Sequence, residues 1–138
     1  MQTMDGMMSR GDEMRDNGIR KAGISCWRYR ELKAFCRQYD EKRAQAMRLQ
    51  GMAGRGQESA ADEVRLHSER LLGDCRLIER TAQEADPGGS EAIIRNAARG
   101  VRYEEAGYYG ERSSFFRARK RFFVALDRGL REREEHAG

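Results

Sequence analysis

The residues best suited to chemistry lie in one basic stretch near the C-terminal end of the sequence. Five cations occur between positions 112 and 121, with no acidic residue among them: Arg112, Arg117, Arg119, Lys120 and Arg121. Two hydroxyl side chains, Ser113 and Ser114, lie beside the first of them. Arginine and lysine bind phosphate, and arginine can also hold a guanine edge through two hydrogen bonds. These seven residues are therefore candidate DNA contacts.

Large apolar residues alternate with these cations, and their spacing is helical. They are Phe115, Phe116, Phe122, Phe123, Leu126 and Leu130. We assign them to a core, which leaves the cations on the opposite side of a helix. Two alternatives stay open at this stage: the cations can be an ordinary solvated face, and single-stranded bases can stack on the phenylalanine rings.

Other residues that often carry chemistry lack partners at a useful spacing. His67 and Cys75 lie eight residues apart, about two helical turns, which is too far for one metal site. The sequence has no CxxC pair, no HExxH motif and no glycine loop that ends in Gly-Lys-Ser or Gly-Lys-Thr. No nucleophile can be paired with a base. We therefore expect no enzyme activity, no metal and no cofactor.

The basic stretch belongs to a series of short elements separated by glycines. The pattern predicts a helix over residues 90–99, a short segment over 101–107, a turn at 108–110 and a long helix over 112–134. This order is typical of a helix-turn-helix unit, in which the start of the second helix enters the major groove. We expect the three tyrosines around the turn to wedge the short segment against the long helix, although a hydroxyl contact with phosphate is an alternative. They are Tyr103, Tyr108 and Tyr109.

The preceding region, residues 25–86, is expected to be an antiparallel helical hairpin. One predicted helix covers 26–50, with Ser25 as its N-cap and an apolar stripe that starts at Trp27. A glycine-rich loop follows, and a second amphipathic helix covers 60–85 until Asp86-Pro87 ends it. Each helix has only one narrow apolar stripe, so we expect the hairpin to form a homodimer or to bind a partner protein.

Composition supports an all-α protein with little interior. The 138 residues are 38% hydrophobic and 36% charged, with a formal net charge of +4. Residues 1–24 have no sustained period, so we expect a flexible tail whose removal leaves stability and DNA affinity nearly unchanged. Three widely spaced cysteines suit a reducing compartment, and we expect neither a membrane-spanning helix nor a secretory signal from the pattern of apolar residues. These features favour the cytoplasm of a host cell.

Three blocks resemble a known group of proteins: YRELKAFCRQYDEKRAQ, DCRLIERTAQEADP and IIRNAARGVRYEEAGYYGERSSFFRARKRFFVALDRGL. They are similar to small uncharacterised phage and prophage proteins of Gram-positive bacteria. That group is likened to RinA- and ArpU-type phage transcriptional regulators and to the C-terminal helix-turn-helix of sigma factors. The resemblance implies that Arg112, Ser113, Ser114 and Arg117 begin a recognition helix. The glycine-rich turn at 106–110 departs from the pattern, so we expect a looser turn.

Two hypotheses of different classes follow. The first is a sequence-specific DNA-binding phage transcriptional regulator that binds duplex DNA through residues 90–134 and contacts RNA polymerase or a second copy through the hairpin. Under this hypothesis Ser113, Ser114 and Arg117 contact bases, while Arg119, Lys120 and Arg121 contact phosphates. The second is a phage-encoded interaction protein that binds a host or packaging protein complex, with the basic helix against RNA or an acidic surface.

Overall fold

The structure is a computed structural model that describes residues 18–53 and 58–137. Over these residues the chain is helical and contains no strand, so the predicted all-α class is confirmed. The helices are α2 (Cys26–Arg37), α3 (Tyr39–Ala53), α4 (Glu58–Ala85), α5 (Ser90–Arg99), α6 (Tyr103–Ala106) and α7 (Arg112–Ala137). Every helix in the described part is too short or too polar to cross a lipid bilayer.

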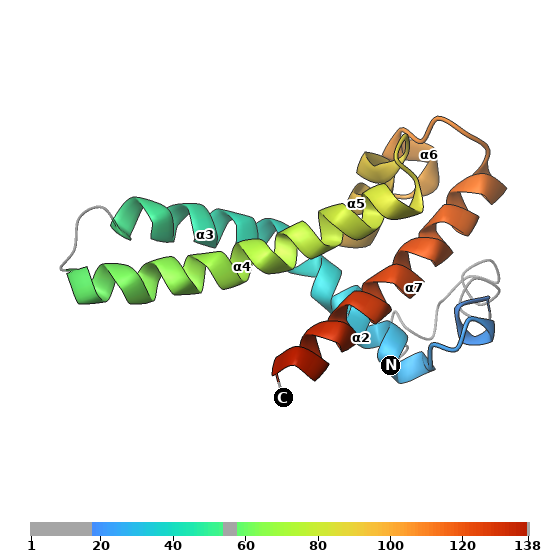
Figure 1. Ribbon diagram of the computed structural model, residues 1–138. Coiled ribbons are helices and arrows are strands. Elements are labelled where there is room, and N and C mark those ends of the chain that lie inside the picture. The colour runs from blue at the N-terminus through green and yellow to red at the C-terminus, as the bar shows by residue number, and fades with distance from the viewer. Residues whose placement is uncertain (1–17, 54–57, 138) are drawn as a thin grey trace, which may run out of the picture.

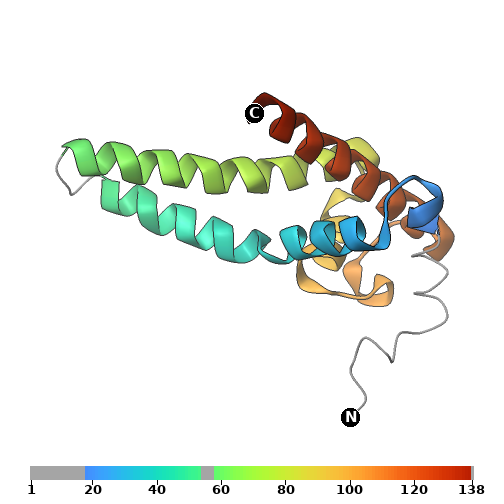
Figure 2. The same cartoon turned by 90° about the horizontal axis from the view of Figure 1, so that it is seen from below.

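The helices separate into a projecting pair and a packed end. α3 lies antiparallel to the first half of α4, and together they extend away from the rest of the molecule (Figures 1 and 2). The second half of α4 packs on α5 and α7, while α2 packs on α5 and α7 from the other side. α4 therefore belongs to both parts and connects them as one continuous helix.

The predicted helix over residues 26–50 is wrong in one respect, because it is two helices. α2 ends at Gln38, whose backbone N–H donates to the carbonyls of Phe35 and Cys36. α3 then starts at once and turns toward α4. The separate packing partners of the two helices explain the break: α2 contacts α5 and α7, whereas α3 contacts α4. No glycine or proline marks this position in the sequence.

Trp27 is a second correction, since the predicted apolar stripe included it. Its side chain is 73% exposed, and the guanidinium of Arg30 lies 5.1 Å from its ring centroid. The buried side of α2 instead consists of Tyr29, Leu32 and Cys36. The predicted N-cap at Ser25 is confirmed, because its hydroxyl accepts a hydrogen bond from the N–H of Arg28 at 3.0 Å.

Residues 18–24 also differ from the prediction of a tail without buried positions. Ile19 and Ile24 are each only 2% exposed and join the core. A short helical turn over residues 18–21 ends at Gly23, whose φ of 90° lies in the left-handed region that glycine adopts easily. The predicted tail therefore does not include residues 18–24, while residues 1–17 lie outside the described residues.

The core lies between α7 and the helices that it crosses. The largest fully buried side chains include Phe115, Phe122 and Phe123 from α7, which confirms their assignment to the core. Tyr29 meets Phe123 edge to face, with ring centroids 5.2 Å apart. Burying side chains of this size stabilises the fold by about 1.5–3 kcal/mol each. One side of α7 is thus fixed inside the protein, and the opposite side faces solvent.

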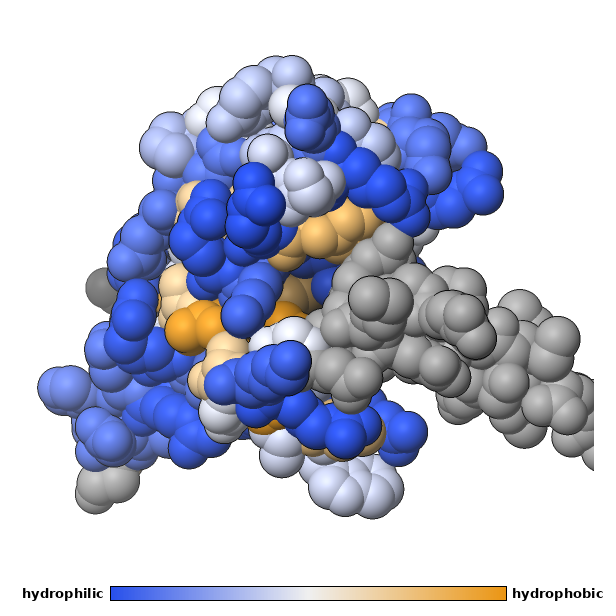
Figure 3. Space-filling view, turned by 90° about the vertical axis from the view of Figure 1, so that its right-hand side faces the viewer, coloured by the Kyte–Doolittle hydropathy of each residue, from blue (hydrophilic) through white to orange (hydrophobic). Residues whose placement is uncertain are grey.

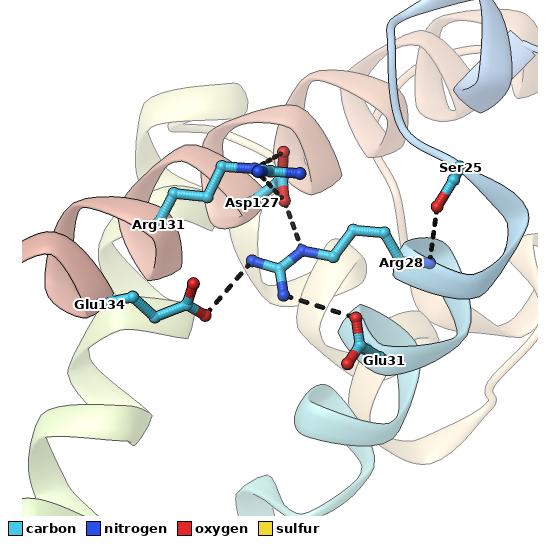
Figure 4. A network of polar contacts seen from close by, with 6 residues as sticks. All are labelled: Ser25, Arg28, Glu31, Asp127, Arg131 and Glu134. Atoms are coloured by element: carbon cyan, nitrogen blue, oxygen red, sulfur yellow. Dashed lines mark hydrogen bonds and ion pairs between the residues drawn. The ribbon is translucent and has the colours of Figure 1, made fainter.

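Two further contacts hold α7 in position. At Gly129, an added Cβ would lie 2.8 Å from a methyl carbon of Leu77, so the backbone of α7 approaches α4 closely at the point where they cross. On α2, Arg28 donates from Nε to Asp127 at 2.6 Å, and Asp127 also accepts from Arg131 (Figure 4). The hydrogen bond with Asp127 is the main cause that raises the pKa of Arg28, so its charge is permanent.

Candidate nucleic-acid interface

The turn before α7 is held by tyrosine hydroxyl groups. Tyr108 donates to Oδ2 of Asp86 at 2.5 Å, and Tyr109 donates to Oδ1 of the same carboxylate at 3.1 Å. Tyr103 donates to the carbonyl of Gly110 at 2.8 Å. Burial, then the hydrogen bond with Asp86, raises the pKa of Tyr108, so its hydroxyl stays protonated. The expectation of a loose turn is therefore wrong, because three side chains tie it to the end of α4 and to α6.

Glycines make this arrangement possible at two places. Gly107 ends α6 with φ 79°, a left-handed conformation that reverses the chain toward α7. Gly89 lies under the ring of Tyr108, where an added Cβ would come within 2.4 Å of a ring carbon. The ring centroids of Tyr103 and Tyr108 lie 5.4 and 5.2 Å from that of Phe115 in α7, which agrees with the expectation that tyrosines wedge α6 against α7. Their hydroxyl groups already have acceptors inside the protein.

A basic surface follows the solvent side of α7, and we call it the α7 basic face. Its members recur at steps of three, four and seven residues, which keeps them on one side of a helix. They are Ser113, Arg117, Lys120, Arg121 and Arg128. The opposite side contains Phe115, Ala118 and Phe122, all fully buried. Because the opposite side of α7 is packed in the core, the fold fixes the direction in which this face points.

Arg117 and Lys120 lie near the middle of the face and are both exposed. Arg117 donates to the hydroxyl of Ser114 at 3.2 Å, a neutral partner from the previous turn. Within the part of the chain that the structure describes, neither cation has a carboxylate within ion-pair distance. Both charges are thus available for an external anion. Ser113 is also exposed, while Ser114 is partly buried.

Arg112 is tied to α6 at the first position of α7. Its Nη1 donates to Oε2 of Glu104 at 2.7 Å, and its guanidinium lies 5.3 Å from the ring centroid of Phe116. A hydrogen bond from its own backbone, and then the bond from Arg112, lowers the pKa of Glu104. The charge of Arg112 is therefore balanced locally, unlike those of Arg117 and Lys120.

Arg119 and Arg121 have intramolecular roles that the sequence prediction did not include. Arg119 is partly buried, donates to Oδ1 of Asn96 at 2.7 Å and lies 4.9 Å from the ring centroid of Phe123. Arg121 donates from Nε and Nη2 to the carbonyl of Ala85 at 3.1 and 3.0 Å. A cation at a helix C-terminus satisfies a free carbonyl and complements the helix dipole. Arg121 thus fastens the end of α4 to α7.

A groove of about 480 Å³ runs beside the α7 basic face, between α7 and the end of α4. Its apolar lining comes from Ala85, Val124 and Ala125. Four cations and one acid also line it: Arg117, Lys120, Arg121, Arg128 and Glu84. Glu84 pairs with Arg128 at 3.4 Å. The groove therefore has an excess of positive charge, and Arg128 extends the face by two turns beyond the predicted stretch. Its eleven-residue spacing from Arg117 is the sequence signal that identifies it.

Other chemistry finds little support in the described residues. They contain no group of three or more His, Cys, Asp or Glu side chains arranged to hold a metal ion. Cys36 and Cys75 are buried, as predicted, and burial raises the pKa of the Cys36 thiol to about 12. His67 lies exposed on α4. The thiol of Cys36 is therefore protonated and a poor nucleophile at neutral pH.

Comparison with known proteins adds no assignment. No family model matches the chain, and neither a curated protein nor a solved structure matches it. The resemblance to phage regulators thus stays a hypothesis that rests on the sequence blocks alone. The functional argument depends on the geometry of α7 and its neighbours.

Proposed function

We propose that this protein is a sequence-specific DNA-binding regulator of phage transcription that binds duplex DNA through α7. One observation carries the proposal: Arg117 and Lys120 are exposed, and no described residue gives them a carboxylate partner, on the solvent side of a helix whose other side is buried. A phosphate backbone supplies the anions that these groups lack. A rigid helix with one free side also suits the width of the major groove.

In this proposal α5, α6 and α7 act as a helix-turn-helix unit, with α7 as the recognition helix. The order of the elements, the left-handed Gly107 and the tied turn support it, although α6 has a single helical turn. Base edges would meet Ser113, Ser114 and Arg117 near the start of α7, where recognition helices read DNA. Lys120 follows one turn later and would contact phosphate.

The test is a binding titration at several salt concentrations. Purified protein is titrated with duplex DNA from upstream of its own operon and with a scrambled duplex of equal length. We expect tighter binding to the first duplex and an affinity that falls with salt on both. Lys120→Ala should lower the slope of log affinity against log salt by about one unit, because one phosphate contact is lost. Arg48→Ala, at an exposed cation of α3, is the matched control and should leave the slope unchanged.

A second function is favoured by a different observation, at the projecting end of the molecule. Three large apolar side chains there are exposed: Met47 by 66%, Met52 by 56% and Leu66 by 49%. They support an interaction protein whose α3–α4 pair binds a host or packaging protein, or a second copy of this chain. Equal binding of the wild-type protein to both duplexes, without salt dependence, would support this second function over the first.

A further inference from the structure

The N-terminal segment, residues 18–24, lies beside the start of α7. A small cavity of about 230 Å³ is lined by Gly18 and Ile19 on one side. Residues from the first turns of α7 line the other side: Ser113, Phe116, Arg117, Arg119 and Lys120. Figure 2 shows the short helical turn next to α7, nearly 100 residues away in the sequence. Seen from this end, the surface has apolar atoms in a recess among hydrophilic side chains (Figure 3).

This segment is held in place by buried side chains and by hydrogen bonds of its own. Ile19 and Ile24 are both buried in the core. Between them, the N–H of Ala22 donates to the carbonyl of Ile19 at 3.0 Å, and the N–H of Gly23 donates to Arg20 at 2.9 Å. These contacts restrict the positions that residues 20–23 can take relative to α7.

Arg20 and Lys21 occupy the exposed part of this turn. In the described residues neither has an ion-pair partner. On the α7 side, the cavity that Gly18 and Ile19 line also contains Arg117 and Lys120, which have no carboxylate partner among the described residues. Arg20 and Lys21 thus directly follow, in the chain, two residues that line the same cavity as Arg117 and Lys120. An anion with regularly repeated charges could meet both pairs of cations.

We propose that Arg20 and Lys21 form a second phosphate contact for the same duplex that α7 binds. This inference rests on the proposed function and adds to it a backbone clamp contributed by the N-terminal segment. Duplex DNA carries one charge per roughly 1.7 Å of its axis, so a second pair of cations meets further phosphates of the same molecule. The clamp adds affinity on every sequence, because phosphate contacts carry no direct base information. It also reverses the expectation that the first 24 residues are dispensable for DNA affinity.

The test is the double substitution Arg20→Ala/Lys21→Ala in the full chain, titrated with the upstream and the scrambled duplex. We expect the slope of log affinity against log salt to fall by about 1.8 units on both, since each phosphate contact contributes about 0.9. The ratio of the two affinities should not change. Arg48→Ala/Arg70→Ala, which removes two exposed cations from the α3–α4 pair, is the matched control. Thermal melting verifies that all variants fold alike.

The outcomes separate the two proposals. A double variant with the same slope as its control overturns the clamp, while salt-dependent binding by the wild type still upholds α7 as the DNA-binding helix. Wild-type protein without salt-dependent binding overturns both. A loss confined to the upstream duplex also overturns the clamp, because it would assign base reading to these residues. A charge reversal, Arg20→Glu/Lys21→Glu, should increase the loss on both duplexes.

Discussion

The α3–α4 pair and the α7 helix with its neighbours use amphipathic helices in opposite ways. Around α7 the large side chains are inside, and Phe115, Phe122 and Phe123 are fully buried. Along the projecting part of α3 and α4 the buried residues Ala46, Ala61 and Ser68 are small, and Ser68 donates to the carbonyl of Ala46 at 3.1 Å. Larger apolar side chains of this pair, such as Met47, remain in solvent.

The difference indicates which kind of partner each region suits. The α7 region buries its apolar residues internally and presents charge, which favours a polyanion. In the α3–α4 pair the two helices contact each other along a narrow strip and leave larger apolar side chains exposed. Exposed apolar side chains favour a protein partner. The two regions thus present different kinds of external surface, one charged and one partly apolar. Substitutions in the two regions should have effects that differ in kind.

The largest expected effect is on folding, at Phe122. Phe122→Ala should lower the free energy of unfolding by about 3–5 kcal/mol, because it removes a fully buried ring and leaves a cavity. Met47→Ala is the counterpart in the other region and should change it by less than about 0.5 kcal/mol. Urea unfolding followed by circular dichroism measures both. Similar losses for the two variants would contradict the comparison.

The next effect tests the proposed reading of bases by α7. Arg117→Ala should weaken binding to the preferred duplex by about 1–3 kcal/mol if its guanidinium holds a base edge. On a scrambled duplex the loss should be much smaller. The free energy of unfolding should hardly change, since the side chain is exposed. Equal losses on both duplexes would remove Arg117 from base reading and favour the interaction-protein hypothesis.

A pH effect is expected where the α3–α4 pair joins the packed end. Burial, and then a hydrogen bond to Glu79, raises the pKa of Tyr39 to about 12 from an ordinary value near 10. The protonated phenol is therefore favoured by folding, and its contribution is complete below pH 10 and lost as the pH rises toward 12. Tyr39→Phe should flatten this alkaline loss of stability relative to the wild type. Unfolding curves between pH 8 and 12 measure it, and parallel curves for the two proteins would refute it.

The smallest effect on stability is expected at the projecting surface. Met47→Ser/Leu66→Ser should leave the free energy of unfolding within about 0.5 kcal/mol of the wild type, because both side chains are exposed. Its effect should be on assembly. Light scattering at high micromolar concentration should give a dimer mass for the wild type and a lower mass for the variant. A monomer mass for the wild type would remove the homodimer from the proposal.

Local chemistry explains which parts of the fold were predictable. Ser25 and Gly100 mark helix ends through capping, and Asp86-Pro87 stops α4 at Ala85 as expected. The start of α7 at Arg112 also agrees with the prediction. Each of these signals depends only on neighbouring residues. Capping preferences and the conformational limits of proline and glycine act over a few residues, so they can be recognised without knowing the fold.

Features that depend on distant contacts were missed. The break at Gln38 exists because α2 and α3 pack on different helices, and neither partner can be identified from periodicity. Ile19 is buried and lines a cavity with α7, which begins more than 90 residues later. The internal bonds of Arg119 and Arg121 likewise join α7 to Asn96 and Ala85. The sequence thus predicted a basic helix, but only the structure distinguishes cations that hold the fold from those that remain available.

The length of α4 sets how far the molecule can reach. Its 28 residues extend over roughly 42 Å at about 1.5 Å per residue, from the tip of the α3–α4 pair to the carbonyl that Arg121 holds. One turn of B-form duplex measures about 34 Å. Under the proposed function, a molecule bound to DNA through α7 would hold the tip of its α3–α4 pair at a distance comparable to one turn of the duplex.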